Sequence, residues 1–185
     1  MAAFQKVCDE LGKSAADVTT AFGSLTLDQL NWKPAEKSWS VAQCLDHVIV
    51  THRLYFPLFE RLADGPAKMS FWENYSPFSG SFGRFLIKNL DPANVKPMKT
   101  TAKAFPSSSE IGPDIVDRYS EHQQRMIAAL EKLPSDIDTS MIITSPLMGV
   151  VTYGLDDALT FMPMHCVRHF NQAKKVTESD GFPIE

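Results

Sequence analysis

Apolar residues recur at spacings of three and four along residues 3–22. They place one apolar side on a helix with 3.6 residues per turn, and the polar residues between them face elsewhere. Gly23 follows the last of them, and glycine often ends a helix. The pattern therefore predicts a first helix over 3–22. Its apolar positions are Phe4, Val7, Cys8, Leu11, Ala15, Val18 and Phe22.

A second helix is predicted over residues 41–64. Ser40 and Gln43 have the spacing of a capping box, in which each side chain bonds the other residue's backbone amide. The sequence Asp64-Gly65-Pro66 ends the segment. Its apolar surface is wide, which indicates a helix buried on most sides. Pro57 removes one backbone hydrogen bond, so we expect a kink there.

Residues 65–112 show the least regular pattern, with a short helix expected near 81–90. A stretch of this length is too long for a simple loop, and it can carry the chain from one end of a helical bundle to the other. Periodic apolar positions return over 113–133 and 155–178, which we expect to be the third and fourth helices. Between them, β-branched residues flank a Pro/Gly turn near 141–153, which fits a small hairpin and equally fits an irregular loop that closes one end of the bundle. The predicted fold is a single domain, 1–185, of the all-α class: a four-helix bundle with a long crossover between helices 2 and 3.

Composition and charge exclude several function classes. The chain has 185 residues and a net charge of −4, and no stripe of Lys and Arg suggests a nucleic-acid interface. No apolar run approaches the ~18 residues that a membrane span needs, and residues 1–6 lack the apolar run of a signal peptide. The three cysteines are scattered, which suits free thiols in a reducing cytoplasm.

The last predicted helix carries His165 and His169, which lie on one face at a spacing of four. Two imidazoles so placed can close on one metal ion, although two partly exposed histidines without a ligand fit the spacing as well. Cys166 stands where zinc proteases have a glutamate, so that class is excluded. A third ligand must then come from elsewhere in the chain.

The second predicted helix carries His47 and His52. A spacing of five residues turns the two side chains ~140° apart around the helix, so His47 and His52 are not expected to bind the same metal ion. His47 lies on an apolar stripe, where a histidine is commonly a hydrogen-bonded core residue. His122, among polar neighbours in the third helix, is expected at the solvent edge.

The chain resembles the DinB/YfiT-like superfamily. The resemblance depends on Trp32-x-Pro34, on the run from Trp39 to His47, on His165-x-x-Arg168-His169-x-x-Gln172 and on the closing Gly181-Phe182-Pro183. It implies a four-helix bundle in which His47, His165 and His169 bind one divalent ion, zinc or nickel, with a position left open. Since imidazole must be neutral to bind a metal, affinity is expected to fall below the usual histidine pKa of about 6.5.

Three further polar residues are candidates for supporting this site. Asp46 and Gln172 are candidates for orienting the ligating imidazoles, although each also fits a polar helix surface. Cys44 lies one turn from His47 and is a candidate for touching the site, with a small buried apolar role as the alternative.

The resemblance implies activation of a small-molecule thiol or assistance to hydrolysis. The sequence therefore predicts a metal-dependent transferase that joins a low-molecular-weight thiol to an electrophile, with walls from Trp39, Tyr153 or segment 65–112. Two alternatives stay open: a metal-dependent hydrolase, and a non-catalytic, stress-related or dimerising bundle in which the metal only stabilises the fold. Small-molecule substrates and a homodimer are expected; nucleic-acid and membrane partners are not.

Overall fold

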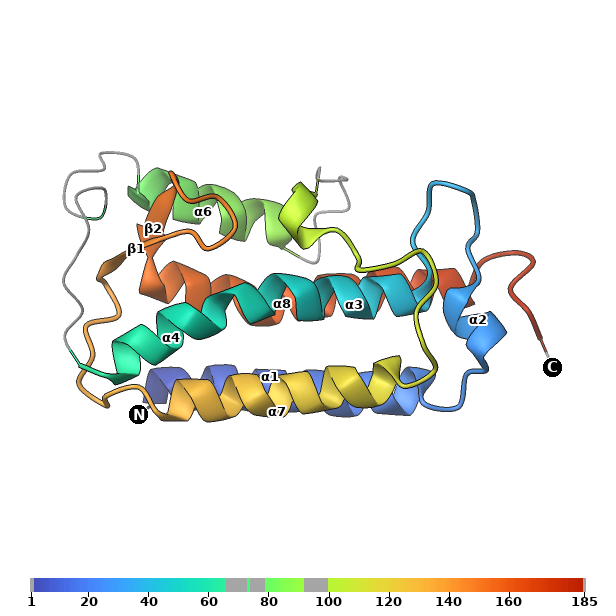
Figure 1. Cartoon of the computed structure of the whole chain (residues 1–185), viewed down its shortest axis with the longest axis horizontal. Coiled ribbons are helices and arrows are strands. Elements are labelled where there is room, and N and C mark those ends of the chain that lie inside the picture. The colour runs from blue at the N-terminus through green and yellow to red at the C-terminus, as the bar shows by residue number, and fades with distance from the viewer. Residues whose placement is uncertain (1, 66–72, 74–78, 92–99, 185) are drawn as a thin grey trace.

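The structure is a computed structural model, and it describes residues 2–65, 73, 79–91 and 100–184. It is a helical bundle with a small two-stranded sheet at one end (Figure 1). The helices and strands in chain order are α1 (Ala2–Phe22), α2 (Leu27–Asn31), α3 (Val41–His52), η1 (Arg53–Tyr55), α4 (Phe56–Ala63), α6 (Ser79–Leu90), η2 (Ala102–Ala104), α7 (Ile115–Glu131), β1 (Ile142–Thr144), β2 (Thr152–Gly154) and α8 (Leu155–Thr177).

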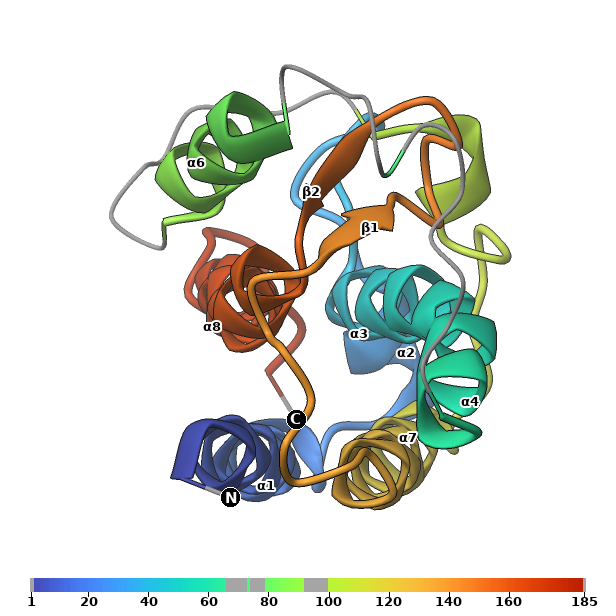
Figure 2. The ribbon, with the colours of Figure 1, turned by 90° about the vertical axis from the view of Figure 1, so that its left-hand side faces the viewer.

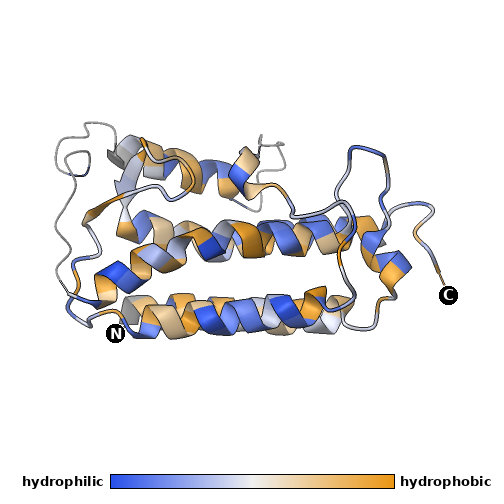
Figure 3. Cartoon of the chain, viewed as in Figure 1, coloured by the Kyte–Doolittle hydropathy of each residue, from blue (hydrophilic) through white to orange (hydrophobic). Residues whose placement is uncertain are grey.

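The four principal helices pack as two antiparallel pairs, α1 with α7 and α3 with α8 (Figures 1 and 2). Contacts of α1 with α8 and of α3 with α7 join the pairs around one core. Figure 3 shows apolar and polar residues mixed along each helix, as expected where one side is buried. The fully buried large side chains include Leu11, Phe22, Leu45, Tyr119, Met126 and Leu130.

The predicted crossover is confirmed. The chain leaves α4 at one end of the bundle and enters α7 at the other end, so α3 and α7 run in the same direction (Figure 1). The short helix expected near 81–90 is α6, which lies outside the bundle against α8 and β2 (Figure 2). The remainder of 65–112 that falls at 66–72, 74–78 and 92–99 lies outside the described residues.

The second predicted helix begins where the capping box places it but is broken before Pro57. Ser40 accepts the Gln43 amide at 3.1 Å, and Gln43 Oε1 accepts the Ser40 amide at 3.3 Å. The chain then tightens into η1 between α3 and α4, with Pro57 in the first turn of α4. Proline has no N–H to continue the ladder, which explains the break.

Of the two alternatives near 141–153, the hairpin is confirmed as β1 and β2, which pair antiparallel with Ile143 opposite Tyr153. Tyr153 and Ile143 are fully buried. β2 leads directly into α8, so the strand fixes where that helix begins. Among the described helices, none is both long enough and apolar enough to cross a membrane.

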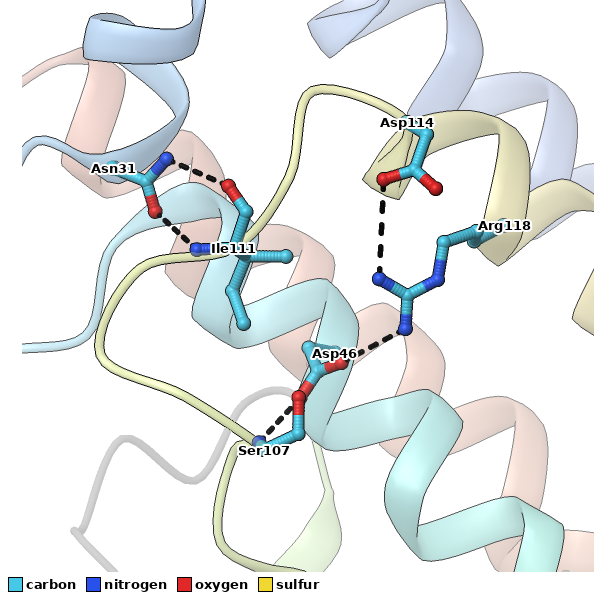
Figure 4. A network of polar contacts seen from close by, with 6 residues as sticks. All are labelled: Asn31, Asp46, Ser107, Ile111, Asp114 and Arg118. Atoms are coloured by element: carbon cyan, nitrogen blue, oxygen red, sulfur yellow. Dashed lines mark hydrogen bonds and ion pairs between the residues drawn. The ribbon is translucent and has the colours of Figure 1, made fainter.

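The last part of the crossover is tied to α2 and α3 by side chains that bond its backbone (Figure 4). Asn31 Oδ1 accepts the Ile111 amide and Asn31 Nδ2 donates to the Ile111 carbonyl, both at 2.9 Å. Asp46 accepts the Ser107 amide at 2.6 Å and pairs with Arg118 at 3.5 Å. These bonds hold residues 104–111 close over α3, which positions one wall of the site described below.

Gly83 sets how closely α6 packs on α8, and replacing it should loosen that contact. A Cβ at this position would overlap the Asp157 carboxylate, which accepts the Gly154 amide at the start of α8. The overlap should cost about 2 kcal/mol, of which about 1 kcal/mol is regained because alanine is the better helix former. Gly83→Ala should therefore lower the free energy of unfolding by about 1 kcal/mol.

Urea unfolding measures this effect, with Gly149→Ala as the matched control. A Cβ at Gly149 meets no atom within 4 Å, so that variant should stay within about 0.5 kcal/mol of the parent. A Gly83→Ala protein as stable as the parent would contradict the close packing of α6.

Candidate metal centre

Three histidines from two helices meet inside the bundle. His47 comes from α3, and His165 and His169 lie one turn apart on α8. Their ligand atoms all lie within 4.8 Å of one another, and each residue is at least nine-tenths buried. Among the described residues no other His, Cys, Asp or Glu joins this group. The three ligands expected from the sequence are therefore brought together, and one ion can reach all three nitrogens.

The ring of His47 is oriented by the crossover. Its Nδ1 lies 2.5 Å from the carbonyl oxygen of Ala104 in η2. A carbonyl only accepts, so Nδ1 carries the proton, and in the neutral ring Nε2 keeps a free lone pair directed at His165 and His169. This outer hydrogen bond is the kind that fixes metal-binding imidazoles.

His52 is not one of the three grouped ligands, as expected, but its ring contacts the ring of His165 on the side away from His47. Its Nε2 lies 3.1 Å from His165 Nδ1, while His165 Nε2 lies 3.1 Å from His47 Nε2. The ring of His165 thus stands between the two α3 histidines and offers a different nitrogen to each. The five-residue spacing does turn His47 and His52 apart, but a third ring from another helix bridges the gap. No signal in the sequence alone indicates that contact.

This geometry gives His52 a defined task. To bind a metal through Nε2, neutral His165 must carry its proton on Nδ1. His52 Nε2 is in place to accept that proton in a hydrogen bond. His52 can therefore hold His165 in the ligating tautomer without itself touching the ion.

Burial keeps these imidazoles neutral. It lowers the pKa of His47 to about 4, against smaller opposing effects of the Ala104 hydrogen bond and the Asp46 charge. Burial also lowers the pKa of His165 and of His169 well below 6.5, and neighbouring histidines and Arg168 lower both further. The site is thus ready to bind metal at neutral pH, and the loss of affinity expected near pH 6.5 is displaced to lower pH.

Trp39 covers one side of the cluster. Its ring stacks on His169 at 5.8 Å between centroids and lies 4.8 Å from that of His47. Trp39 stands immediately before the cap residue Ser40, so the capping box that starts α3 also fixes this indole beside the site.

The three histidines line a cavity of about 920 Å³ whose wall is largely apolar. Trp39 and Tyr153 both border it, as expected, and so do α6 and the described part of 100–105. Tyr153 shares a 2.5 Å hydrogen bond with Tyr55, and burial raises the pKa of each phenol, so both stay protonated. The cavity has the size of a small-molecule site.

The three residues expected to support the ligands differ in outcome. The Asp46 carboxylate bonds Ser107 and Arg118, so it holds the crossover that carries Ala104, and its charge also raises the pKa of His47. Cys44 is fully buried in the hydrophobic core and does not border the cavity, which agrees with a small buried apolar role and not with contact to the site. Gln172 borders the cavity and raises the pKa of His169, less strongly than burial lowers it.

His122 is buried rather than at the solvent edge. Its ring lies 6.3 Å from that of His52 and 5.6 Å from that of Phe56, between α7 and the break before α4. Desolvation lowers its pKa to about 4. The prediction relied on the polar residues beside His122 in the sequence. It was wrong because Phe56, which is distant in the chain, packs against the ring of His122.

Comparison with known families agrees with this architecture. The family model of the DinB superfamily matches residues 10–173. The chain belongs to the DinB superfamily. No functionally curated protein matches it significantly.

Among solved structures, this DinB-superfamily chain is similar to YfiT from Bacillus subtilis, with a TM-score of 0.63 and 16% sequence identity. The match covers 97% of this chain and 89% of YfiT. YfiT is described as a probable metal-dependent hydrolase with an unusual four-helix bundle topology. At this identity the likeness shows a shared fold.

Removing the hydrogen-bond partner of His165 should weaken metal binding. His52→Leu should reduce zinc affinity about 10- to 100-fold, measured by competition with a chromophoric chelator. His52→Gln should keep most of the affinity, because its amide oxygen can still accept from His165 Nδ1.

The matched control is His122→Leu, which removes a buried histidine that lies outside the group of three ligands. That variant should bind zinc like the parent. Equal zinc affinity for His52→Leu and the parent would sink the positioning role of His52.

The metal-free protein should lose stability as pH falls from 6.5 toward 4. His47 and His122 have folded pKa values of about 4, whereas the unfolded chain takes up protons near 6.5. The unfolded state then binds more protons, so each such histidine lowers the free energy of unfolding by about 1.4 kcal/mol per pH unit in this window. Above pH 6.5 these histidines are neutral in both the folded and the unfolded protein, so they no longer change the free energy of unfolding.

Urea unfolding at several pH values tests this dependence. His122→Gln should make the acid loss shallower by about one proton. A free energy of unfolding that stays constant between pH 7 and 5 would contradict the buried neutral state.

Proposed function

We propose that this protein is a metal-dependent enzyme that joins a low-molecular-weight thiol to an electrophilic small molecule. In this proposal His47, His165 and His169 hold one divalent ion, zinc or nickel. The observation that carries it is the position of the three neutral imidazoles on the wall of a cavity large enough for a substrate.

The donor set fits a catalytic rather than a structural metal. Structural zinc sites are commonly closed by four protein ligands, whereas catalytic ones keep a position for water or substrate. Imidazole suits both zinc and nickel. A divalent ion held here would lower the pKa of a thiol or water bound beside the histidines.

The residues around the cluster supply orientation and exclude water. The Ala104 carbonyl and His52 Nε2 hold two of the imidazoles in place. Trp39 covers His47 and His169 on one side, and Phe82 and Phe161 contribute apolar wall. The thiolate is the nucleophilic form of a thiol. Taking this anion out of water is unfavourable, and a divalent ion beside the histidines would offset that cost.

The reaction needs no protein nucleophile. The thiol gives its proton to solvent, its sulfur forms a bond to the electrophilic carbon, and the leaving group departs with the bonding electron pair. The described residues at the site agree with a reaction that uses no protein nucleophile. The cysteine nearest in sequence to His47 is Cys44, which is buried away from the cavity, and burial raises its pKa.

Hydrolysis is the second candidate, favoured by the description of YfiT. The same open position can activate a water molecule instead of a thiol. The non-catalytic alternative, a metal that only stabilises the bundle, is disfavoured by the cavity that reaches the cluster and by the three-ligand donor set.

The test incubates zinc- or nickel-loaded protein with bacillithiol, mycothiol or glutathione and a panel of electrophiles, and follows thiol consumption. A parallel panel of esters and amides without thiol reports hydrolysis. His169→Ala should lower thiol consumption at least 100-fold, to the background rate, because a two-ligand site holds the ion poorly. His122→Ala, which removes a buried histidine outside the cluster, should keep the rate.

The outcomes separate the candidates. Ester or amide cleavage without thiol consumption would favour the hydrolase. Absence of both activities, together with a markedly lower melting temperature for His169→Ala, would establish the structural role of the metal instead.

A further inference from the structure

The wall of the cavity carries formal charge of one sign only. Lys37, Arg168 and Lys175 border it, and no Asp or Glu does so among the described residues. The chain as a whole is acidic, with 22 Asp and Glu against 18 Lys and Arg. The cavity is therefore a positive region in a negative protein, which attracts anions.

The cations are placed around the site on two elements. Arg168 and Lys175 lie two turns apart on α8, on the side that also carries His165 and Gln172. Arg168 is half-buried and bonds the Asp91 carbonyl at 3.5 Å, at the end of α6. Lys37 comes from the loop before α3, two residues before Trp39. Lys37 and Lys175 are exposed, so they mark the mouth of the cavity.

The body of the cavity is apolar. Phe82, Phe85 and Leu86 of α6 border it. Tyr153, whose ring stacks on that of Phe82 at 6.4 Å between centroids, and Phe161 continue this apolar wall. Phe85 is 52% exposed although it is a large apolar residue. An aromatic body buried against these rings gains about 25 cal/mol for each Å² of apolar surface removed from water.

We propose that the substrate of this cavity is an organic anion with an apolar, aromatic-sized body. The body lies against the rings of Phe82, Phe85 and Phe161, and its carboxylate or similar acidic group lies at the mouth beside Lys37 and Lys175. This inference rests on the proposed function in taking the cavity as the substrate site, and it adds the chemical class of the molecule.

The experiment compares two probes that differ only in charge, 2-naphthylacetate and 2-naphthylacetamide. Chelator-treated protein is used, so that the carboxylate finds no metal, and binding is measured by isothermal titration calorimetry. The acid should bind at least about fivefold more tightly at low salt. The preference should shrink at ~1 M salt, where screening acts over ~3 Å.

Charge-removing variants locate the effect. Lys37→Gln combined with Lys175→Gln should remove most of the preference for the acid and leave amide binding unchanged. Lys174→Gln is the matched control: it removes the same charge from the adjacent position, where Lys174 pairs with Glu178 at 3.7 Å and does not border the cavity. This control should behave like the parent.

Three results would overturn the proposal: equal affinity for acid and amide, an effect of Lys174→Gln as large as that of the double variant, or no binding of either probe. The assay involves neither metal nor turnover, so its failure would leave the three-histidine enzyme intact. In the same way, a metal-loaded protein without thiol or hydrolase activity would leave a measured preference for the acid standing.

Discussion

Keeping imidazole uncharged inside the bundle is the constraint on which the rest of this structure depends. All five histidines of the chain are buried, and each has a lowered pKa. A buried imidazolium without a counter-charge is expensive, whereas the neutral ring can be packed at moderate cost and offers a lone pair. This burial destabilises the fold at acidic pH, and it also keeps the lone pairs of the cluster free for a bound cation.

This arrangement leaves unsatisfied groups that the surrounding core must offset. Among the described residues, His52 Nδ1 and His122 Nε2 have no hydrogen-bond partner. A buried polar atom without a partner costs about 1–3 kcal/mol. Such local departures from the rules of packing are typical of functional sites, where stability is exchanged for chemistry. The continuous apolar core shared by α1, α3, α7 and α8 supplies the compensation.

The crossover has a positioning role beyond joining two helices. Asp46 and Asn31 bond its backbone at Ser107 and Ile111 (Figure 4). The segment held in this way presents the Ala104 carbonyl to His47. Farther back along the chain, α6 adds apolar wall to the cavity. One segment therefore fixes a ligand orientation and shapes the space that a substrate would occupy. Changes in it can alter the substrate without touching the histidines, which is how function commonly varies on a constant scaffold.

The sequence by itself determined the elements and the ligand candidates. Apolar periodicity located the four principal helices to within a few residues, the Ser40–Gln43 box located the start of α3, and the turn before Tyr153 located the hairpin. These features are local: they depend on spacing, capping and turn chemistry within a few residues. The spacing of four indicated the pair His165 and His169 for the same reason, whereas His47 was joined to them by the resemblance to the DinB/YfiT-like superfamily.

Only the tertiary structure decided which residues support that cluster. His52 joins it because the ring of His165, from another helix, lies between His47 and His52. The Asp46 carboxylate accepts a hydrogen bond from the Ser107 amide, not from a histidine ring. The hydrogen-bond partner of His47 Nδ1 is the backbone carbonyl of Ala104, and a pattern of side chains along the sequence cannot predict a backbone partner. The positive mouth likewise combines Lys37 with Lys175, which are far apart in the chain. Contacts between distant segments depend on how the helices pack and rotate against one another. A single sequence shows only which residues lie on each face of each helix.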